Sequence, residues 1–128
     1  MKTLTIKQPW ASLIIDEYKK YEFRSWKINF RGKILIHAGI GVDNDMMRLL
    51  NNYNLEYVKG AIIGEATITD CILVDDNFND KLYKLNPLVY KKNNYVGKYA
   101  WKLENIIKYK EPIYCKGKLG LWNYETDK

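Results

Sequence analysis

The chain has few of the residues that build metal, redox or disulfide sites. Its 128 residues include two cysteines, Cys71 and Cys115, and one histidine, His37. Two cysteines support no disulfide framework, and a zinc site would need both thiols to meet that single histidine at spacings that match no zinc motif. We therefore predict no metal and no cofactor, and we expect a reducing cytoplasm as the compartment.

Long apolar runs and several common catalytic motifs are missing too. No run approaches the roughly 20 apolar residues of a membrane span, and the longest is broken at Gly64 and Glu65. The first residues do not show the positively charged and then apolar pattern of a secretory signal, so we expect none. The phosphate-loop glycine pattern, G-x-S-x-G, C-x-x-C and H-E-x-x-H are all absent. These absences set aside the chemistries that those motifs mark and predict no membrane partner.

What is present is ample material for one packed core. Apolar residues make up 47% of the chain and aromatic residues 14%, with four tryptophans and eleven tyrosines. A chain of this length fits one domain, because domains cluster near about 100–150 residues. We expect a single domain over residues 1–124, a frayed tail at residues 125–128, and a monomer.

The formal net charge is +6, and its distribution is uneven. Residues 43–80 hold two cations against eight acids, whereas residues 81–118 hold ten lysines against Glu104 and Glu111. Such asymmetry suits a protein that binds a polyanion, because lysines along a groove release counterions from phosphates. A solvated face in a chain rich in Lys, Asn, Ile and Tyr explains the same numbers, so charge alone leaves both interpretations open.

Short segments alternate apolar and polar residues, and fewer follow a helical period. Alternation predicts strands at residues 2–7, 21–26, 33–38, 61–74, 99–109 and 113–124, the last interrupted at residues 116–117. A helical period predicts a helix that starts at Gln8 with Pro9 in its first turn and fades over residues 18–20. A second helix is predicted over residues 43–50, capped by Asp43.

Two segments depart from regular lengths. The strand predicted over residues 61–74 is longer than usual, so we expect a bend at Gly64. Residues 75–98 contain Pro87 and no sustained period, which predicts a long loop with one helical turn at residues 81–85. Five or six strands with two or three short helices, without regular βαβ alternation, indicate an α+β domain built as a mixed β-barrel.

The stretch QPWASLIIDEYKKYEFRSW over residues 8–26 concentrates polar chemistry. Lys19 stands at the junction of helix and strand, and Glu22, Arg24 and Trp26 share one strand face. A guanidinium offers planar donors to a phosphate or base edge, a carboxylate accepts from an exocyclic amine, and an indole provides a stacking surface. These groups together suit nucleotide recognition, although ordinary cross-strand ion pairs with a solvated lysine would use the same residue types.

The same residues carry a resemblance to a known family. QPWA, K-x-x-E-x-R-S-W, RGKILIHA, GAIIGEA, YAW and the closing KGKLGLW resemble an ASCH domain, named for activating signal cointegrator homology, over nearly the whole chain. The family signature G-x-K-x-x-E-x-R falls on residues 17–24, with Glu17 where the family usually has glycine. We expect Glu17 to lengthen the helix by a turn and to shift Lys19 slightly, leaving the three polar groups in place.

The resemblance implies a PUA-like barrel with an RNA-binding cleft beneath the first helix, lined by the signature residues. Some small members are amidohydrolases that deacetylate N4-acetylcytidine with the signature lysine, a threonine and a glutamate, and others cleave single-stranded RNA. The lysine position matches Lys19, but the threonine position holds Glu22. A hydroxyl mechanism therefore does not carry over unchanged: Glu22 would have to activate water, with Lys19 or Arg24 stabilising an oxyanion.

Further residues are weighed between packing and function. His37 is interpreted first as a core histidine with satisfied hydrogen bonds and second as a general base. Glu65 is either a cleft carboxylate or half of a salt bridge. The aromatic residues Trp10 and Trp101 fit either the core or a wall of the cleft. Three lysines in and after the long loop are either solvated or placed to contact phosphates, namely Lys91, Lys92 and Lys98.

Three functions follow as hypotheses. The leading one is a module that binds nucleic acid, preferably RNA with an unstacked base, or a modified nucleoside, with Lys19, Glu22 and Arg24 reading the base. The second is a metal-free hydrolase acting on nucleosides of the N4-acetylcytidine type or on single-stranded RNA, for which the same three residues are catalytic. The third is a protein-interaction domain that shares the fold.

Overall fold

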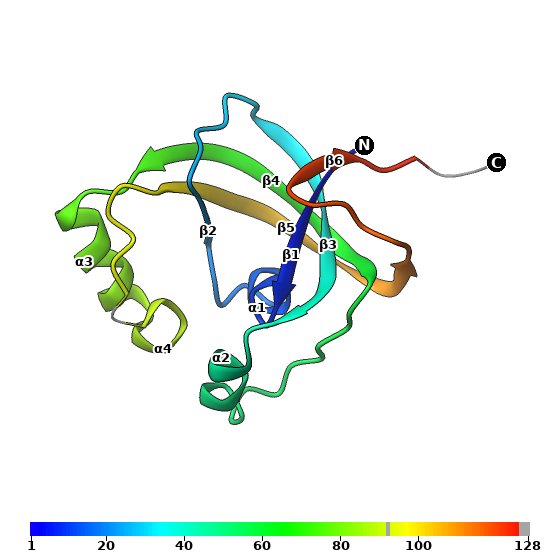
Figure 1. Ribbon diagram of the computed structural model, residues 1–128, viewed down its shortest axis with the longest axis horizontal. Helices are drawn as coiled ribbons and strands as arrows, with labels where there is room; N and C mark the ends of the chain where they lie inside the picture. The colour runs from blue at the N-terminus through cyan, green and yellow to red at the C-terminus, as the bar shows by residue number, and fades with distance from the viewer. Residues whose placement is uncertain (92, 126–128) are drawn as a thin grey trace.

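The computed structural model of the protein describes residues 1–91 and 93–125, and in them it contains six strands and four short helices (Figure 1). The strands are β1 (Lys2–Gln8), β2 (Tyr21–Arg24), β3 (Gly32–Val42), β4 (Ala61–Leu73), β5 (Tyr99–Tyr114) and β6 (Leu121–Asn123). The helices are α1 (Trp10–Ile15), α2 (Asn44–Leu49), α3 (Asp76–Leu85) and α4 (Pro87–Tyr90). The α+β class and the six strands are confirmed, with one helix more than the two or three expected.

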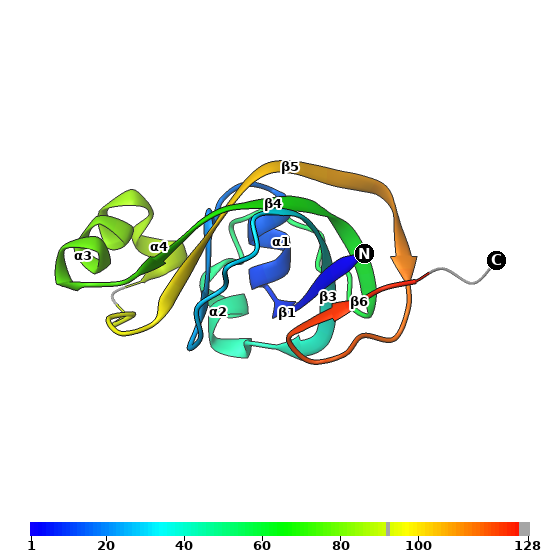
Figure 2. The ribbon, with the colours of Figure 1, turned by 90° about the horizontal axis from the view of Figure 1, so that it is seen from above.

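All six strands form one mixed sheet in the order β2-β5-β4-β3-β1-β6. The β1–β3 pair is parallel, and the other neighbours are antiparallel. Because β2 and β6 lie at opposite edges, the strands curve without closing into a hydrogen-bonded barrel. Figure 2 shows β4 and β5 arching over α1, which packs against the sheet from inside this curve.

A glycine produces the bend predicted in β4. The register between β4 and β5 shifts between Ile62 and Gly64. A Cβ built on Gly64 would lie 2.4 Å from the backbone oxygen of Ile107 in β5, so a larger residue would separate the two strands here. The close approach of the strands requires glycine, as expected from the sequence for a bulged and curved strand.

Residues 76–90 form two helices where one helical turn in a loop was predicted, so that prediction was wrong. The side chain of Asp75 caps α3 by accepting from the backbone N–H of Phe78. Asn86 caps α4 in the same way, and Pro87 occupies its first turn. In α3, Phe78, Leu82 and Leu85 follow a helical spacing, but this period is short and stands among polar and charged residues, so it was not recognised as a helix from the sequence.

The strand β5 also runs on through Pro112, where the sequence predicted a break after residue 109. In the pairing with β4, Lys108 lies opposite Gly64 and Ile113 lies opposite Ile62. Residues 109–112 therefore bulge out of the ladder, and Pro112 needs no N–H there.

The core lies on both sides of α1. One cluster fills the curve of the sheet between α1 and the strands. A second cluster joins Leu13 of α1 to buried residues in and beside α2, α3 and α4. Among the described residues no helix is long and apolar enough to cross a membrane.

Candidate functional site

The end of α1 sets the position of Lys19. Glu17 has a φ of 65°, which is the left-handed conformation that glycine favours. The N–H of Tyr18 donates to the oxygen of Leu13 at 2.8 Å and that of Glu17 to the oxygen of Ile14 at 3.0 Å, the two bonds of a Schellman motif. The helix thus ends at Ile15, and the expectation that Glu17 would lengthen it was wrong.

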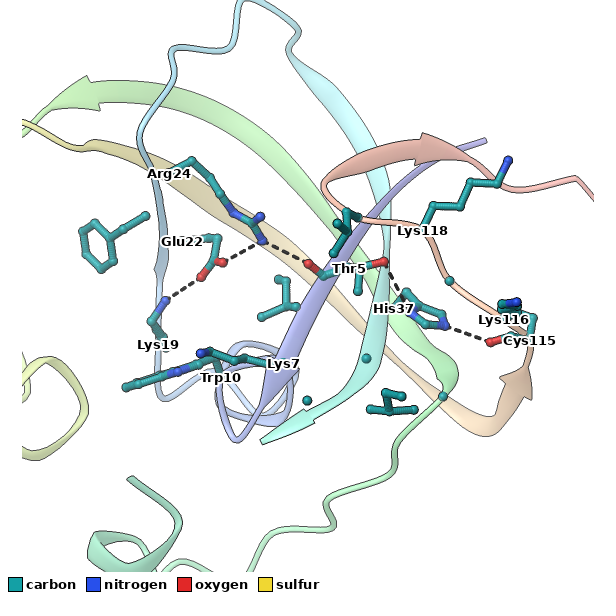
Figure 3. Close-up of a pocket in the computed structure, with 18 of the residues that line it drawn as sticks. Thr5, Lys7, Trp10, Lys19, Glu22, Arg24, His37, Cys115, Lys116 and Lys118 are labelled. Atoms are coloured by element: carbon teal, nitrogen blue, oxygen red, sulfur yellow. Dashed lines mark hydrogen bonds and ion pairs between the residues drawn. The ribbon is translucent and has the colours of Figure 1, made fainter. Parts of the chain in front are cut away.

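Three charged side chains of the signature meet beside β2 (Figure 3). The ammonium Nζ of Lys19 lies 2.9 Å from Oε1 of Glu22, and Nη2 of Arg24 lies 2.9 Å from Oε2 of the same carboxylate. Lys19 also donates to the backbone oxygen of Tyr21 at 2.6 Å, and Arg24 to that of Thr5 at 3.0 Å. One carboxylate is therefore clamped between two cations that are themselves held by backbone carbonyls.

Burial shapes the ionisation of this triad. Lys19 is 4% exposed and Glu22 is 9% exposed. Burial lowers the pKa of Lys19, and the attraction of Glu22 offsets only part of that effect. Burial by itself raises the pKa of Glu22, but the charges and hydrogen bonds of Lys19 and Arg24 together outweigh it and leave the pKa below the usual value. Glu22 is thus an ionised acceptor, while Lys19 is a cation that gives up its proton more readily than an exposed lysine.

Aromatic rings surround the ammonium group. Nζ of Lys19 lies 5.4 Å from the ring centroid of Trp10 and 5.0 Å from that of Phe23, both within the range of cation–π attraction. Phe23 is stacked on Tyr95 with ring centroids 4.0 Å apart. Of the aromatic residues predicted for the site, Trp10 is the one that lines the cavity described next.

The triad opens on a cavity of about 720 Å³. Residues of β1, β2 and β3 line it, together with residues 115–119 from the connection between β5 and β6. Its described lining carries a single carboxylate, that of Glu22, against five cationic side chains, namely Lys7, Lys19, Arg24, Lys116 and Lys118. The cavity is therefore cationic, with mixed polar and aromatic groups at the triad.

The opposite end of the cavity contains a directed chain of hydrogen bonds. Trp122 Nε1, which only donates, lies 2.8 Å from Oγ1 of Thr5. That hydroxyl lies 3.4 Å from Nδ1 of His37, whose Nε2 lies 2.9 Å from the carbonyl oxygen of Cys115, which only accepts. If the imidazole is neutral, this series of hydrogen bonds places its proton on Nε2. Nδ1 then accepts a hydrogen bond from the hydroxyl of Thr5. Both ring nitrogens are engaged, as predicted for a histidine with a structural role.

Three other predicted ligand contacts lie outside the cavity lining. Trp101 is fully buried in the core and packs edge-to-face on Trp26, with ring centroids 4.6 Å apart. Glu65 accepts from the hydroxyl of Tyr109 at 2.6 Å and lies 3.1 Å from Nζ of Lys33. For Trp101 and Glu65, these contacts match the plainer of the two interpretations that the sequence left open. A ligand role for all three residues stays a prediction.

Apart from Lys19, the lysines that line the cavity are not those predicted to contact phosphates. Lys91 and Lys98 are not among its lining residues, and Lys92 lies outside the described residues. Lys116 and Lys118 were not predicted from the sequence, although two lysines around Gly117 mark a cationic turn. In the part of the chain that the structure describes, no three His, Cys, Asp or Glu side chains gather as metal ligands.

Comparisons with known proteins point to one family. Two crystal structures of ASCH proteins from Zymomonas mobilis share the fold. The first has a TM-score of 0.58 at 19% identity, and the second, a serine-to-alanine mutant protein, has a TM-score of 0.52 at 16% identity. Each comparison covers 88% of this chain and 72% of the other.

Activating signal cointegrator 1 of Homo sapiens is 31% identical over 81 residues, and so is that of Mus musculus. The aligned part is 54% of this chain and only 14% of either cointegrator. A family model described as the ASCH domain matches residues 4–113. Because that match takes in most of the chain, the protein belongs to the ASCH domain family.

Proposed function

We propose that this ASCH domain binds nucleic acid, preferably RNA with an unstacked base, or a modified nucleoside, in the cavity beside β2. The observation that carries the proposal is the buried triad of Lys19, Glu22 and Arg24 at the cavity wall. A buried charge cluster is costly unless its members are paired, and this one places its donors and acceptors beside an open volume.

The triad offers both kinds of hydrogen-bonding group that a base edge needs. A carboxylate has about four acceptor sites, and Lys19 and Arg24 each occupy one of those on Glu22. The remaining lone pairs suit an exocyclic amine, and the guanidinium of Arg24 suits a base carbonyl or a phosphate. Because Lys19 and Arg24 hold the carboxylate in position, the ligand meets acceptors that are already oriented.

The aromatic rings and the net charge of the cavity support the same proposal. Trp10 and the stacked pair of Phe23 and Tyr95 supply π-faces beside the triad, and stacking of a base on such rings is tolerant of its identity. The excess of cations over Glu22 attracts the phosphates of a strand. An unstacked base satisfies both features at once, whereas a base inside a duplex exposes neither face.

The direct test is fluorescence anisotropy with a labelled single-stranded oligoribonucleotide, its duplex form and a panel of nucleosides. We expect the single strand to bind more tightly than the duplex, and Arg24→Gln to weaken binding by about tenfold, the loss of one or two charge-assisted hydrogen bonds. Arg48→Gln is the matched control, because Arg48 pairs with Asp45 on the exposed face of α2 and does not line the cavity.

Two results would contradict the proposal. One is that the wild-type protein binds none of the strands or nucleosides at low salt. This result can be interpreted without any variant. The other is unchanged affinity in Arg24→Gln when its melting temperature shows that it is folded. A melting temperature that no RNA or nucleoside shifts would favour the protein-interaction function instead.

A hydrolase is the second candidate, and the lowered pKa of the buried Lys19 favours it. A lysine with a reduced pKa serves as a base or nucleophile more readily than an exposed one. Glu22, by contrast, is clamped by two cations and is a weak base. Release of acetate from N4-acetylcytidine, lost in Lys19→Ala, would support hydrolysis, and no turnover across modified nucleosides and single-stranded RNA would exclude it.

A further inference from the structure

The cavity has a second end, separate from the triad. Figure 3 shows Lys19, Glu22 and Arg24 on one side of β1, and His37, Cys115 and Lys116 on the other, with Thr5 between them. The backbone oxygen of Thr5 accepts from Arg24, and its hydroxyl lies beside His37. A single residue of β1 therefore links the two ends.

Residues 115–120 form the wall of this second end, and we refer to them as the strap. The strap is held at both of its ends. The N–H of Cys115 donates to the oxygen of Gly60 at 3.1 Å, and its carbonyl oxygen lies 2.9 Å from Nε2 of His37. The carbonyl oxygen of Gly120 accepts from the N–H of Thr5 at 3.1 Å. The strap is thus fixed to β1, β3 and the start of β4 by backbone hydrogen bonds and one imidazole.

The middle of the strap lies directly against His37. A Cβ built on Gly117 would fall 2.3 Å from Cε1 of the ring, a distance that real side chains do not show. Glycine at this position lets the backbone touch the imidazole. Lys116 and Lys118, on either side of it, both line the cavity and are exposed to solvent.

The strap lysines lack the partners that the triad cations have. Within residues 1–91 and 93–125, the ion pairs involve neither Lys116 nor Lys118. Solvent-accessible ammonium groups on a fixed backbone wall attract an anion from solution. The cavity lining also includes Gly39 and Gly41, which have no side chain to fill the space.

We infer that the strap is a phosphate-binding end of the cavity, in which Lys116 and Lys118 bind a phosphate attached to the sugar whose base faces the triad. This inference rests on the function proposed above. It names the ligand class as a nucleotide or a phosphodiester strand, because a free nucleoside would leave the strap lysines unused. His37 is a positioning residue here, since its Nε2 holds the strap at the carbonyl oxygen of Cys115.

The test compares the affinities of adenosine, cytidine, guanosine and uridine with those of their 3′- and 5′-monophosphates, measured by calorimetry at low salt. We expect the monophosphate of the preferred base to bind at least about tenfold more tightly than its nucleoside, as one or two charge-assisted contacts would provide. The double variant Lys116→Gln/Lys118→Gln should lose that preference while keeping its affinity for the nucleoside. The matched control is Lys81→Gln/Lys84→Gln, which removes the same charge from exposed positions of α3.

Each outcome separates this inference from the proposed function. Equal binding of nucleoside and monophosphate by the wild type would overturn the inference and leave the proposed function standing. Two results would show that the strap lysines do not cause the preference for a monophosphate. Either that preference survives in Lys116→Gln/Lys118→Gln, or it falls equally in Lys81→Gln/Lys84→Gln. If neither nucleosides nor monophosphates bind the wild type while single-stranded RNA does, the proposed function stands and this inference fails. If no strand binds either, both fail.

Discussion

Gly117 lies against the imidazole of His37 so closely that an added Cβ would fall 2.3 Å from Cε1 and 2.5 Å from Nδ1. The same ring holds the carbonyl of Cys115. One histidine therefore fixes both the start and the middle of the strap. The position of Lys116 and Lys118 depends on this contact, which joins residues that are far apart in the sequence.

The first prediction concerns Gly117→Ala. The new methyl group has to displace the strap or the ring, so we expect the preference for a monophosphate over its nucleoside to fall by about tenfold, the order of one charge-assisted contact. Calorimetry with the same nucleosides and monophosphates measures this. Asn77→Ala is the control, because Asn77 is an exposed residue of α3 and does not line the cavity. Equal preference in the two variants would show that the strap does not depend on its contact with His37.

The second prediction concerns Glu17, which adopts a left-handed conformation at a φ of 65°. A side chain in that conformation costs about 1 kcal/mol relative to glycine. We therefore expect Glu17→Gly to raise the free energy of unfolding by about 1 kcal/mol, measured by urea denaturation. Glu56→Gly is the control, since Glu56 is not among the residues with positive φ, and it should bring no gain. A loss of stability in Glu17→Gly would show that its side chain stabilises the helix end.

Sequence reasoning located the triad because the required information is local. Alternation in residues 21–26 places Glu22 and Arg24 on one face, and the preceding helix supplies Lys19 at the junction. The end of that helix was not predictable from propensity, because Glu17 disfavours the left-handed conformation that it adopts. The Schellman hydrogen bonds and the packing of the helix outweigh that local preference.

The second end of the cavity could not be predicted from the sequence for a different reason. Cys115 and His37 are 78 residues apart, and they meet because β5 runs the length of β4 before the chain returns to β1 through β6. Alternation in a strand tells which face a residue takes but not which distant segment covers that face. The same limit applies to Trp101, because the alternation of its strand is compatible with a core position and with a cleft position.

The third prediction is a pH dependence that comes from Glu22. Its pKa lies below the ordinary value in the folded protein, so the stability it contributes is fully present above its unfolded pKa of about 4.3. That contribution is lost as the pH falls through the folded pKa. Glu22→Gln leaves Lys19 buried without its counter-charge and should cost about 3–5 kcal/mol near neutral pH. We expect this difference from the wild type to shrink on acidification below about pH 4.5, in urea titrations at several pH values.

Asp45→Asn is the control for this pH dependence. Asp45 pairs with Arg48 where both side chains are mostly exposed, so we expect a change below about 1 kcal/mol at any pH. If the loss in free energy of unfolding caused by Glu22→Gln stayed constant from neutral pH to below about pH 4.5, Glu22 would not be the titrating partner of Lys19. Loss of the buried ion pair would then act through packing alone.

The last prediction concerns the salt dependence of binding to single-stranded RNA. Each phosphate neutralised on a single strand contributes a slope of about −0.7 to a plot of log affinity against log salt concentration. If Lys116 and Lys118 contact phosphates, the slope for Lys116→Gln/Lys118→Gln should be less steep than the wild-type slope by about 1.4. The control Lys81→Gln/Lys84→Gln should keep the wild-type slope. Anisotropy titrations between about 50 and 200 mM salt measure both slopes. A wild-type affinity that does not change over this range would rule out phosphate contacts anywhere on the domain, and a slope unaltered in the strap variant would place them on other lysines.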